Sequence, residues 1–119
     1  MNTAQLVEIE RGLWLKPGPW LAATALPRCW FALPDPIGLT DRNALQKQIG
    51  HMETGLDIVD ARVELITDDV AILVYRASSR QEPSGPRYLC SSSYVKGRRS
   101  WSLAHHQRTR VGATSGETD

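Results

Sequence analysis

The sequence predicts an α+β domain in which helices cover one face of a strongly bent antiparallel sheet. Apolar residues recur at helical spacing early in the chain, and from Leu56 onward they alternate with polar residues as they do in strands. Short stretches rich in glycine, proline or aspartate separate the alternating segments, as hairpin turns do. A bent sheet covered by helices encloses space in which ligand cavities form.

A first amphipathic helix is expected over about residues 3–16. Leu6, Ile9 and Leu13 recur at helical spacing and define its apolar face. At roughly 100° per residue, Glu10 projects close to the centre of this face. An unpaired buried carboxylate is strongly disfavoured, so Glu10 is expected to have a partner.

Two shorter helices and one short strand follow. The second helix is expected over about residues 19–25, with proline in its first turn, and the strand over residues 29–33. The third helix is expected over about residues 40–49. Thr40 is its predicted N-cap, and Gly50 ends it.

Four consecutive strands complete the domain, at about residues 56–65, 70–78, 88–96 and 100–111. The strand over residues 70–78 is apolar on both faces, so something must cover the outer side of the sheet. We therefore predict a homodimer formed through the outer sheet face.

The last strand alternates with period two, and its predicted inner row changes from apolar to polar. That row consists of Trp101, Leu103, His105, Gln107, Thr109 and Val111. The change at His105 and Gln107 indicates a core that opens into a pocket. Counting back from Val59, which is predicted to face inward, Asp57 also has the inner phase, at the start of its strand.

Composition limits the possible functions. The chain of 119 residues is expected to form one domain over residues 1–111, followed by a disordered polar tail over residues 112–119. A net charge of +1 indicates no general attraction to nucleic acid or membranes. The N-terminus lacks a signal-peptide pattern, and no stretch approaches the roughly 18 apolar residues of a membrane span, so a cytoplasmic location is expected.

No cofactor or metal is expected. Cys29 and Cys90 are too few and too far apart for a metal motif, so both are expected to be buried thiols. His105 and His106 cannot both ligate one ion from a regular strand, because adjacent side chains point to opposite faces.

Three stretches resemble the nuclear transport factor 2-like superfamily. They are Leu6–Trp14, Ile37–Arg42 and the closing hairpin Tyr94–Thr109, which resembles that of a small bacterial branch labelled a domain of unknown function. The resemblance implies three N-terminal helices packed on a strongly curved mixed or antiparallel sheet, the cystatin-like cone fold. The superfamily includes ketosteroid isomerases and polyketide cyclases, and one fold hosts many chemistries.

The resemblance also implies a cavity between the first helix and the concave sheet face. The candidate ligand-binding residues are Glu10, Trp14, Asp57, His105 and Gln107, with Tyr75 and Tyr88 as further candidates. Trp14 lies where an isomerase would have a tyrosine, which argues against direct transfer of that mechanism. His105 with Asp57 could imitate the His–Asp pair of dehydratases of this fold.

Three hypotheses for function remain open. The first is a small-molecule-binding domain whose cavity takes an apolar or mixed ligand. The second is an isomerase, dehydratase or cyclase in which His105, the best catalytic candidate, or a carboxylate transfers a proton. The third is a non-catalytic dimeric association module with a filled cavity. His105 and Glu10 also have purely structural interpretations, as hydrogen-bonded wall residue and as partner of a neighbouring group.

Overall fold

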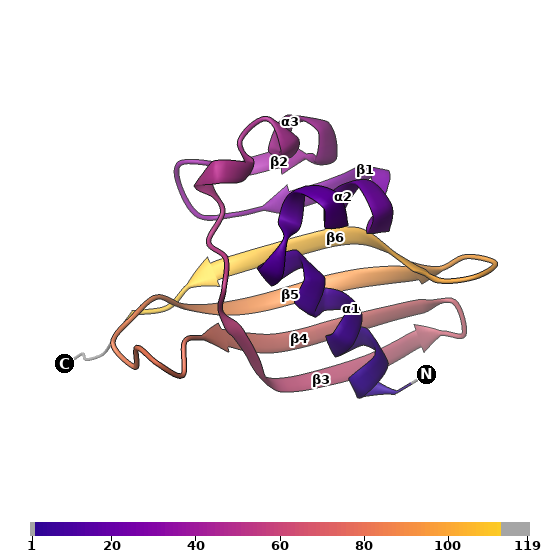
Figure 1. Cartoon of the computed structure of the whole chain (residues 1–119). Coiled ribbons are helices and arrows are strands. Elements are labelled where there is room, and N and C mark those ends of the chain that lie inside the picture. Colours follow the sequence, from indigo (N-terminus) through magenta and orange to yellow (C-terminus); the bar gives the residue numbers. More distant parts are fainter. Residues whose placement is uncertain (1, 113–119) are drawn as a thin grey trace.

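The computed structural model describes residues 2–112, which form a six-stranded sheet with helices over one face (Figure 1). The helices are α1 (Thr3–Leu15), α2 (Pro17–Thr24), α3 (Arg42–Gln46) and the 3-10 helix η1 (Ile49–His51). The strands are β1 (Ala25–Ala32), β2 (Leu39–Asp41), β3 (Asp57–Thr67), β4 (Val70–Ser78), β5 (Arg87–Lys96) and β6 (Trp101–Arg110). No helix in this part of the chain is long and apolar enough to cross a membrane.

The strand order is β2-β1-β6-β5-β4-β3, and every neighbouring pair is antiparallel except β1 with β6. The sheet is therefore mixed, and α1 packs across it over β3 and β4 while α2 lies against β1 and β6 (Figure 1). The predicted α+β class, with three helices on a curved sheet, is confirmed. Of the predicted tail, residues 113–119 lie outside the described residues.

Helix α1 begins with a capping box in which Asn2 and Gln5 exchange side-chain and backbone hydrogen bonds. Its buried residues are Leu6, Glu10, Leu13 and Trp14. The predicted inward position of Glu10 is thus confirmed, because its side chain is fully buried.

Two local predictions near β2 are wrong. Residues 39–41 form a strand, because Thr40 pairs with Phe31 of β1, a contact that local sequence does not reveal. The third helix begins later than expected and is capped by Asp41, whose Oδ1 accepts a hydrogen bond from the backbone N–H of Ala44 at 2.8 Å.

A β-bulge interrupts β6. Tyr94 pairs with Leu103, whereas the preceding residue, Ser93, pairs with His105. Ala104 is therefore an extra residue on β6, and the alternation of side chains reverses on passing it.

The reversal overturns two predicted orientations. Beyond the bulge the buried side chains are His106 and Arg108, which are 0% and 4% exposed. His105 and Gln107 lie on the outer face instead, where Gln107 accepts a hydrogen bond from Ser91 at 3.0 Å. Their predicted inward orientation is wrong, because counting by two across an unrecognised bulge assigns every later residue to the opposite face.

The same error affects the start of β3. Asp60 has a φ of 54°, and the pairing of β3 with β4 shifts between Val59 and Arg62. Asp57 therefore takes the outer phase, where its carboxylate lies 3.8 Å from the Arg80 guanidinium, and its predicted inward orientation is wrong.

We predict that Gly12→Ala destabilises the fold. A Cβ at Gly12 would lie 2.3 Å from Cδ1 of Trp20, whose Nε1 donates to the Ile9 carbonyl at 2.7 Å. Overpacking should lower the free energy of unfolding by about 1–3 kcal/mol in urea titrations. The control is Gly18→Ala in α2, where the nearest atom is 3.9 Å away and a change below about 1 kcal/mol is expected. Equal stabilities of the two variants would contradict the close contact.

Candidate functional site

A buried polar cluster surrounds the carboxylate of Glu10. Its Oε2 accepts hydrogen bonds from the hydroxyls of Tyr75 and Ser92, each at 2.6 Å, and its Oε1 accepts one from Tyr94. Trp14 Nε1 donates to the Tyr75 hydroxyl at 2.9 Å. The donors come from β4 and β5, so the sheet supplies the partners that a buried carboxylate on α1 requires.

His106 links this cluster to Arg108. Its Nδ1 lies 2.6 Å from the Ser92 hydroxyl and 3.2 Å from Glu10 Oε2. Its Nε2 accepts a hydrogen bond from Arg108 Nε at 2.9 Å. Because an arginine nitrogen can only donate, Nε2 must be the accepting nitrogen of a neutral ring, and the ring proton lies on Nδ1.

Arg108 is a buried cation in which two of the three guanidinium nitrogens donate to protein acceptors. Its Nη1 donates to the backbone carbonyl of Glu53 at 3.0 Å, and its guanidinium carbon lies 3.5 Å from the ring centroid of Trp14. Stacking on an indole stabilises a desolvated guanidinium. Its Nη2 is buried and has no hydrogen-bond partner within residues 2–112.

The ionisation states follow from these contacts. Burial alone raises the pKa of Glu10, but the interaction with His106 and the hydrogen bonds from Ser92 and Tyr75 outweigh it and lower the pKa to about 2. Burial lowers the pKa of His106 and outweighs the contact with Glu10, which raises it, while Arg108 acts in the same direction as burial. Glu10 and Arg108 thus carry opposite buried charges, and the neutral side chains of Ser92 and His106 connect them by hydrogen bonds.

The tyrosine donors remain protonated. Burial, followed by the negative charge of Glu10, raises the pKa of both Tyr75 and Tyr94 well above the usual value. Each hydroxyl can therefore donate to the carboxylate over the whole physiological pH range.

Ser92, His106 and Glu10 are the residue types of a nucleophilic triad, but their geometry differs from one. The Ser92 hydroxyl donates directly to the carboxylate, and the second ring nitrogen of His106 contacts Arg108. In a triad the imidazole lies between hydroxyl and carboxylate, and the nucleophile is open to substrate. Ser92 is fully buried, so its hydroxyl is not open to a substrate.

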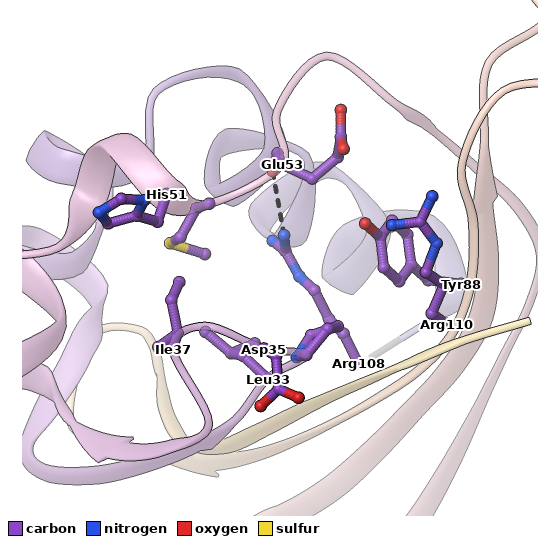
Figure 2. A pocket seen from close by; sticks show the side chains of 10 residues that line it. Leu33, Asp35, Ile37, His51, Glu53, Tyr88, Arg108 and Arg110 are labelled. Atoms are coloured by element: carbon purple, nitrogen blue, oxygen red, sulfur yellow. Dashed lines mark hydrogen bonds between the residues drawn. The ribbon is translucent and has the colours of Figure 1, made fainter.

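A pocket of about 150 Å³ lies next to the cluster, with Arg108 in its wall. In Figure 2, the Arg108 side chain lies between Leu33 and Ile37 on one side and Tyr88 and Arg110 on the other. The remaining lining residues are Pro34, Asp35, His51, Met52 and Glu53. The pocket therefore has an apolar part and a charged part that contains two arginines and the two acidic residues Asp35 and Glu53.

The structure separates the predicted site residues. Glu10 and Trp14 face the interior as predicted, but neither lines the pocket, and whether either contacts a ligand remains a prediction. Tyr75 and Tyr88 also face inward, and Tyr88 lines the pocket. Asp57, His105 and Gln107 belong to the outer face, as described above.

Sequence reasoning missed Ser92, His106 and Arg108. One signal was available, since three consecutive serines, Ser91–Ser93, are unusual within a central strand. Ser92 shares the inward face with Tyr94, and that shared face indicates a polar interior. Arg108 could not be placed without knowledge of the bulge.

The remaining predicted features concern thiols and metals. Cys29 and Cys90 are buried as predicted, and burial is the main reason that the pKa of each rises to about 12. Within residues 2–112, no group of three or more His, Cys, Asp or Glu side chains could hold a metal ion.

Comparisons with known proteins establish the fold. No family model and no curated protein matches the sequence. A candidate ketosteroid isomerase from Parabacteroides distasonis has a TM-score of 0.73 at 11% identity, covering 93% of this chain and 89% of that one. A nuclear transport factor 2-like protein of unknown function from Rhodospirillum rubrum has a TM-score of 0.72 at 16% identity, with 94% and 100% covered.

A CaMKII hub from S. rosetta is also similar, with a TM-score of 0.72 at 17% identity over 92% of this chain and 96% of that one. These likenesses show that the chain has the nuclear transport factor 2-like fold, as the sequence resemblance implied. Proteins of such different kinds share this architecture that function must be argued from the site.

We predict that acid weakens the fold through His106 and Glu10. The folded-state pKa of each is lowered from 6.5 and 4.5 respectively, so below these values the unfolded chain binds more protons. The free energy of unfolding should therefore fall as the pH is lowered from 6.5 through 4.5 toward about 2.

Glu10→Gln should lower the free energy of unfolding by about 3–5 kcal/mol near neutral pH, because the charge of Arg108 loses its counter-charge. Glu8→Gln, at an exposed position of the same helix, is the control and should change little. If the free energies of unfolding of wild type and Glu10→Gln differed by the same amount at every pH down to 2, the lowered pKa of Glu10 would be contradicted.

Proposed function

We propose that this domain binds a small organic anion in the pocket, with Arg108 as the anchor. The observation that carries the proposal is the Nη2 group of Arg108, a buried donor without a hydrogen-bond partner within residues 2–112. Leaving a charged donor unsatisfied costs more than an ordinary hydrogen bond contributes, and native structures rarely do so. Arg108 lines the pocket, so a small movement of its guanidinium would let an oxyanion there accept a hydrogen bond from Nη2.

The pocket limits what the rest of the ligand can be. Leu33, Ile37 and Met52 offer an apolar surface next to the cation, which suits a short hydrocarbon tail. A volume of about 150 Å³ is well below the roughly 300–1,000 Å³ of pockets that take drug-sized ligands. A short-chain carboxylate fits these limits, whereas a steroid-sized ligand does not.

Catalysis by His105 is not part of this proposal. A general base must reach the proton that it abstracts, and His105 projects from the outer face of the sheet, away from the pocket. His106 is fully buried, and each of its ring nitrogens is already engaged. The arrangement around Arg108 therefore supports binding better than proton transfer.

We predict that the wild-type protein binds butyrate and that Arg108→Met abolishes this binding. Isothermal titration calorimetry should show butyrate binding at least about tenfold more tightly than butyramide, its neutral isostere, because only the carboxylate adds the attraction of an opposite charge to the hydrogen bond with Arg108. The matched control is Arg80→Met, which removes an exposed arginine outside the pocket. Equal binding of butyrate by Arg108→Met and Arg80→Met would refute the anchor.

We also propose that the chain forms a homodimer through the outer face of the sheet. Val74 and Leu89 project from this face and are 42% and 45% exposed. Together with Ser91 and Gln107 they line an open hollow of about 600 Å³. Apolar side chains around a shallow hollow are typical of an association surface, and a self-complementary surface produces a two-fold dimer.

The charges around this hollow favour a second copy over a strongly charged partner. Arg76 lies 3.9 Å from Asp60, so these two charges compensate each other, and Arg62 lines the hollow beside Asp60. A surface that carries both signs can face a copy of itself without strong repulsion, whereas a surface of one sign cannot.

We predict that the double variant Val74→Asp, Leu89→Asp is monomeric. Four carboxylates would be buried at the two-fold interface, which is prohibitive without partners. Sedimentation velocity at micromolar concentration should show a dimer for wild type and for Leu15→Asp, a control at an exposed leucine at the end of α1. A monomeric wild type, or a dimer that survives the double substitution, would refute this interface.

A further inference from the structure

The hydrogen bonds between Arg108 and Glu10 all run in one direction. Arg108 Nε donates to His106 Nε2, the ring N–H on Nδ1 donates to the Ser92 hydroxyl oxygen, and Ser92 donates to Glu10 Oε2. Each donor can be satisfied only because Glu10, at the end of the series, accepts without donating. We therefore expect the direction of the hydrogen bond between Arg108 and His106 to depend on Glu10, which does not line the pocket.

We infer that Glu10 is a positioning residue for the anion site, acting by holding His106 in the tautomer with its proton on Nδ1. This inference rests on the proposed anion binding. With Nε2 free to accept, Arg108 Nε is held, Nη1 reaches the Glu53 carbonyl, and Nη2 is left for the ligand. If the ring proton moved to Nε2, two N–H groups would oppose each other and the guanidinium would lose this contact.

Removing the acceptor at position 10 tests this dependence. In Glu10→Met the Ser92 hydroxyl loses its acceptor, and His106 Nδ1, at 2.6 Å, is the partner left to it. Donation from Ser92 to Nδ1 would place the ring proton on Nε2, facing Arg108, although Arg108 by itself favours the Nδ1–H form. An Nδ1–H ring in Glu10→Met would therefore show that Arg108 and not Glu10 sets the tautomer. The Glu10→Gln side chain keeps an oxygen that can accept from Ser92 and Tyr75, while its amide can donate to the Tyr94 hydroxyl, so the ring proton should stay on Nδ1.

We therefore expect Glu10→Gln and Glu10→Met to differ in the tautomer of His106, although both variants lose the charge of Glu10. The experiment is nitrogen-15 NMR of histidine-labelled protein, in which protonated and unprotonated ring nitrogens have distinct shifts, together with butyrate titration of the same samples. We expect His106 to be in the Nδ1–H form in wild type and Glu10→Gln, and in the Nε2–H form in Glu10→Met. Butyrate affinity should fall at least about tenfold in Glu10→Met and stay within about threefold of wild type in Glu10→Gln.

Ser92→Ala supplies a second test should Glu10→Met fail to fold. Without the serine, the N–H on Nδ1 can still donate to Glu10 Oε2, which lies 3.2 Å away. The Nδ1–H form and butyrate binding should therefore both persist in Ser92→Ala. Loss of either in this variant would contradict the role of Glu10.

The outcomes separate the inference from the proposed function. A wild type that does not bind butyrate refutes the proposed function, and with it the role of Glu10 in binding. A wild type that binds butyrate but carries the proton on Nε2 of His106 refutes only the inference. Equal loss of butyrate affinity in Glu10→Gln and Glu10→Met would also refute the inference. The charge of Glu10, and not its ability to accept a hydrogen bond from Ser92, would then control the site.

Discussion

The rest of the structure depends on the solvation of one buried carboxylate. Glu10 lies on the face of α1 that packs on the sheet, where an unpaired charge would be untenable. Hydroxyls from β4 and β5 take the place of water, and His106 of β6 completes the surroundings. Helix α1 can therefore dock in only one register, because a shift by one turn would carry the carboxylate away from all of its donors.

Local signals account for the parts of the fold that could be predicted. The spacing of Leu6 and Leu13 indicates α1, and the alternating segments separated by turn residues indicate the four long strands. The strand β2 and the parallel pairing of β1 with β6 carry no such signal. Both arise from pairing with β1, of Thr40 with Phe31 in one case and of His106 with Phe31 in the other, and single-sequence patterns contain no information on those contacts.

The candidate site was predictable on the helix and not on the strands. Glu10 and Trp14 lie on a regular helix, where the periodicity holds over the whole element. On β6 the bulge at Ala104 exchanges the two faces, and no glycine marks the position. Because His105 and His106 are adjacent, either face of the strand presents an imidazole, so the sequence could not reveal which face had been chosen.

The indirect pairing of Glu10 with Arg108 explains how a buried cation can keep a donor for the proposed ligand. A direct arginine–carboxylate pair is commonly bidentate and would use two nitrogens of the guanidinium. Here the charges compensate each other across Ser92 and His106, which lowers the cost of burying both ions. The carboxylate nevertheless cannot reach the donor that remains on Nη2.

The separation between Glu10 and Arg108 also limits how far the carboxylate weakens the attraction of Arg108 for an anion. The proposed ligand would contact the guanidinium directly, whereas Glu10 acts through two intervening groups. Separating the counter-charge from the cation thus makes stability of the interior compatible with the proposed binding at its edge.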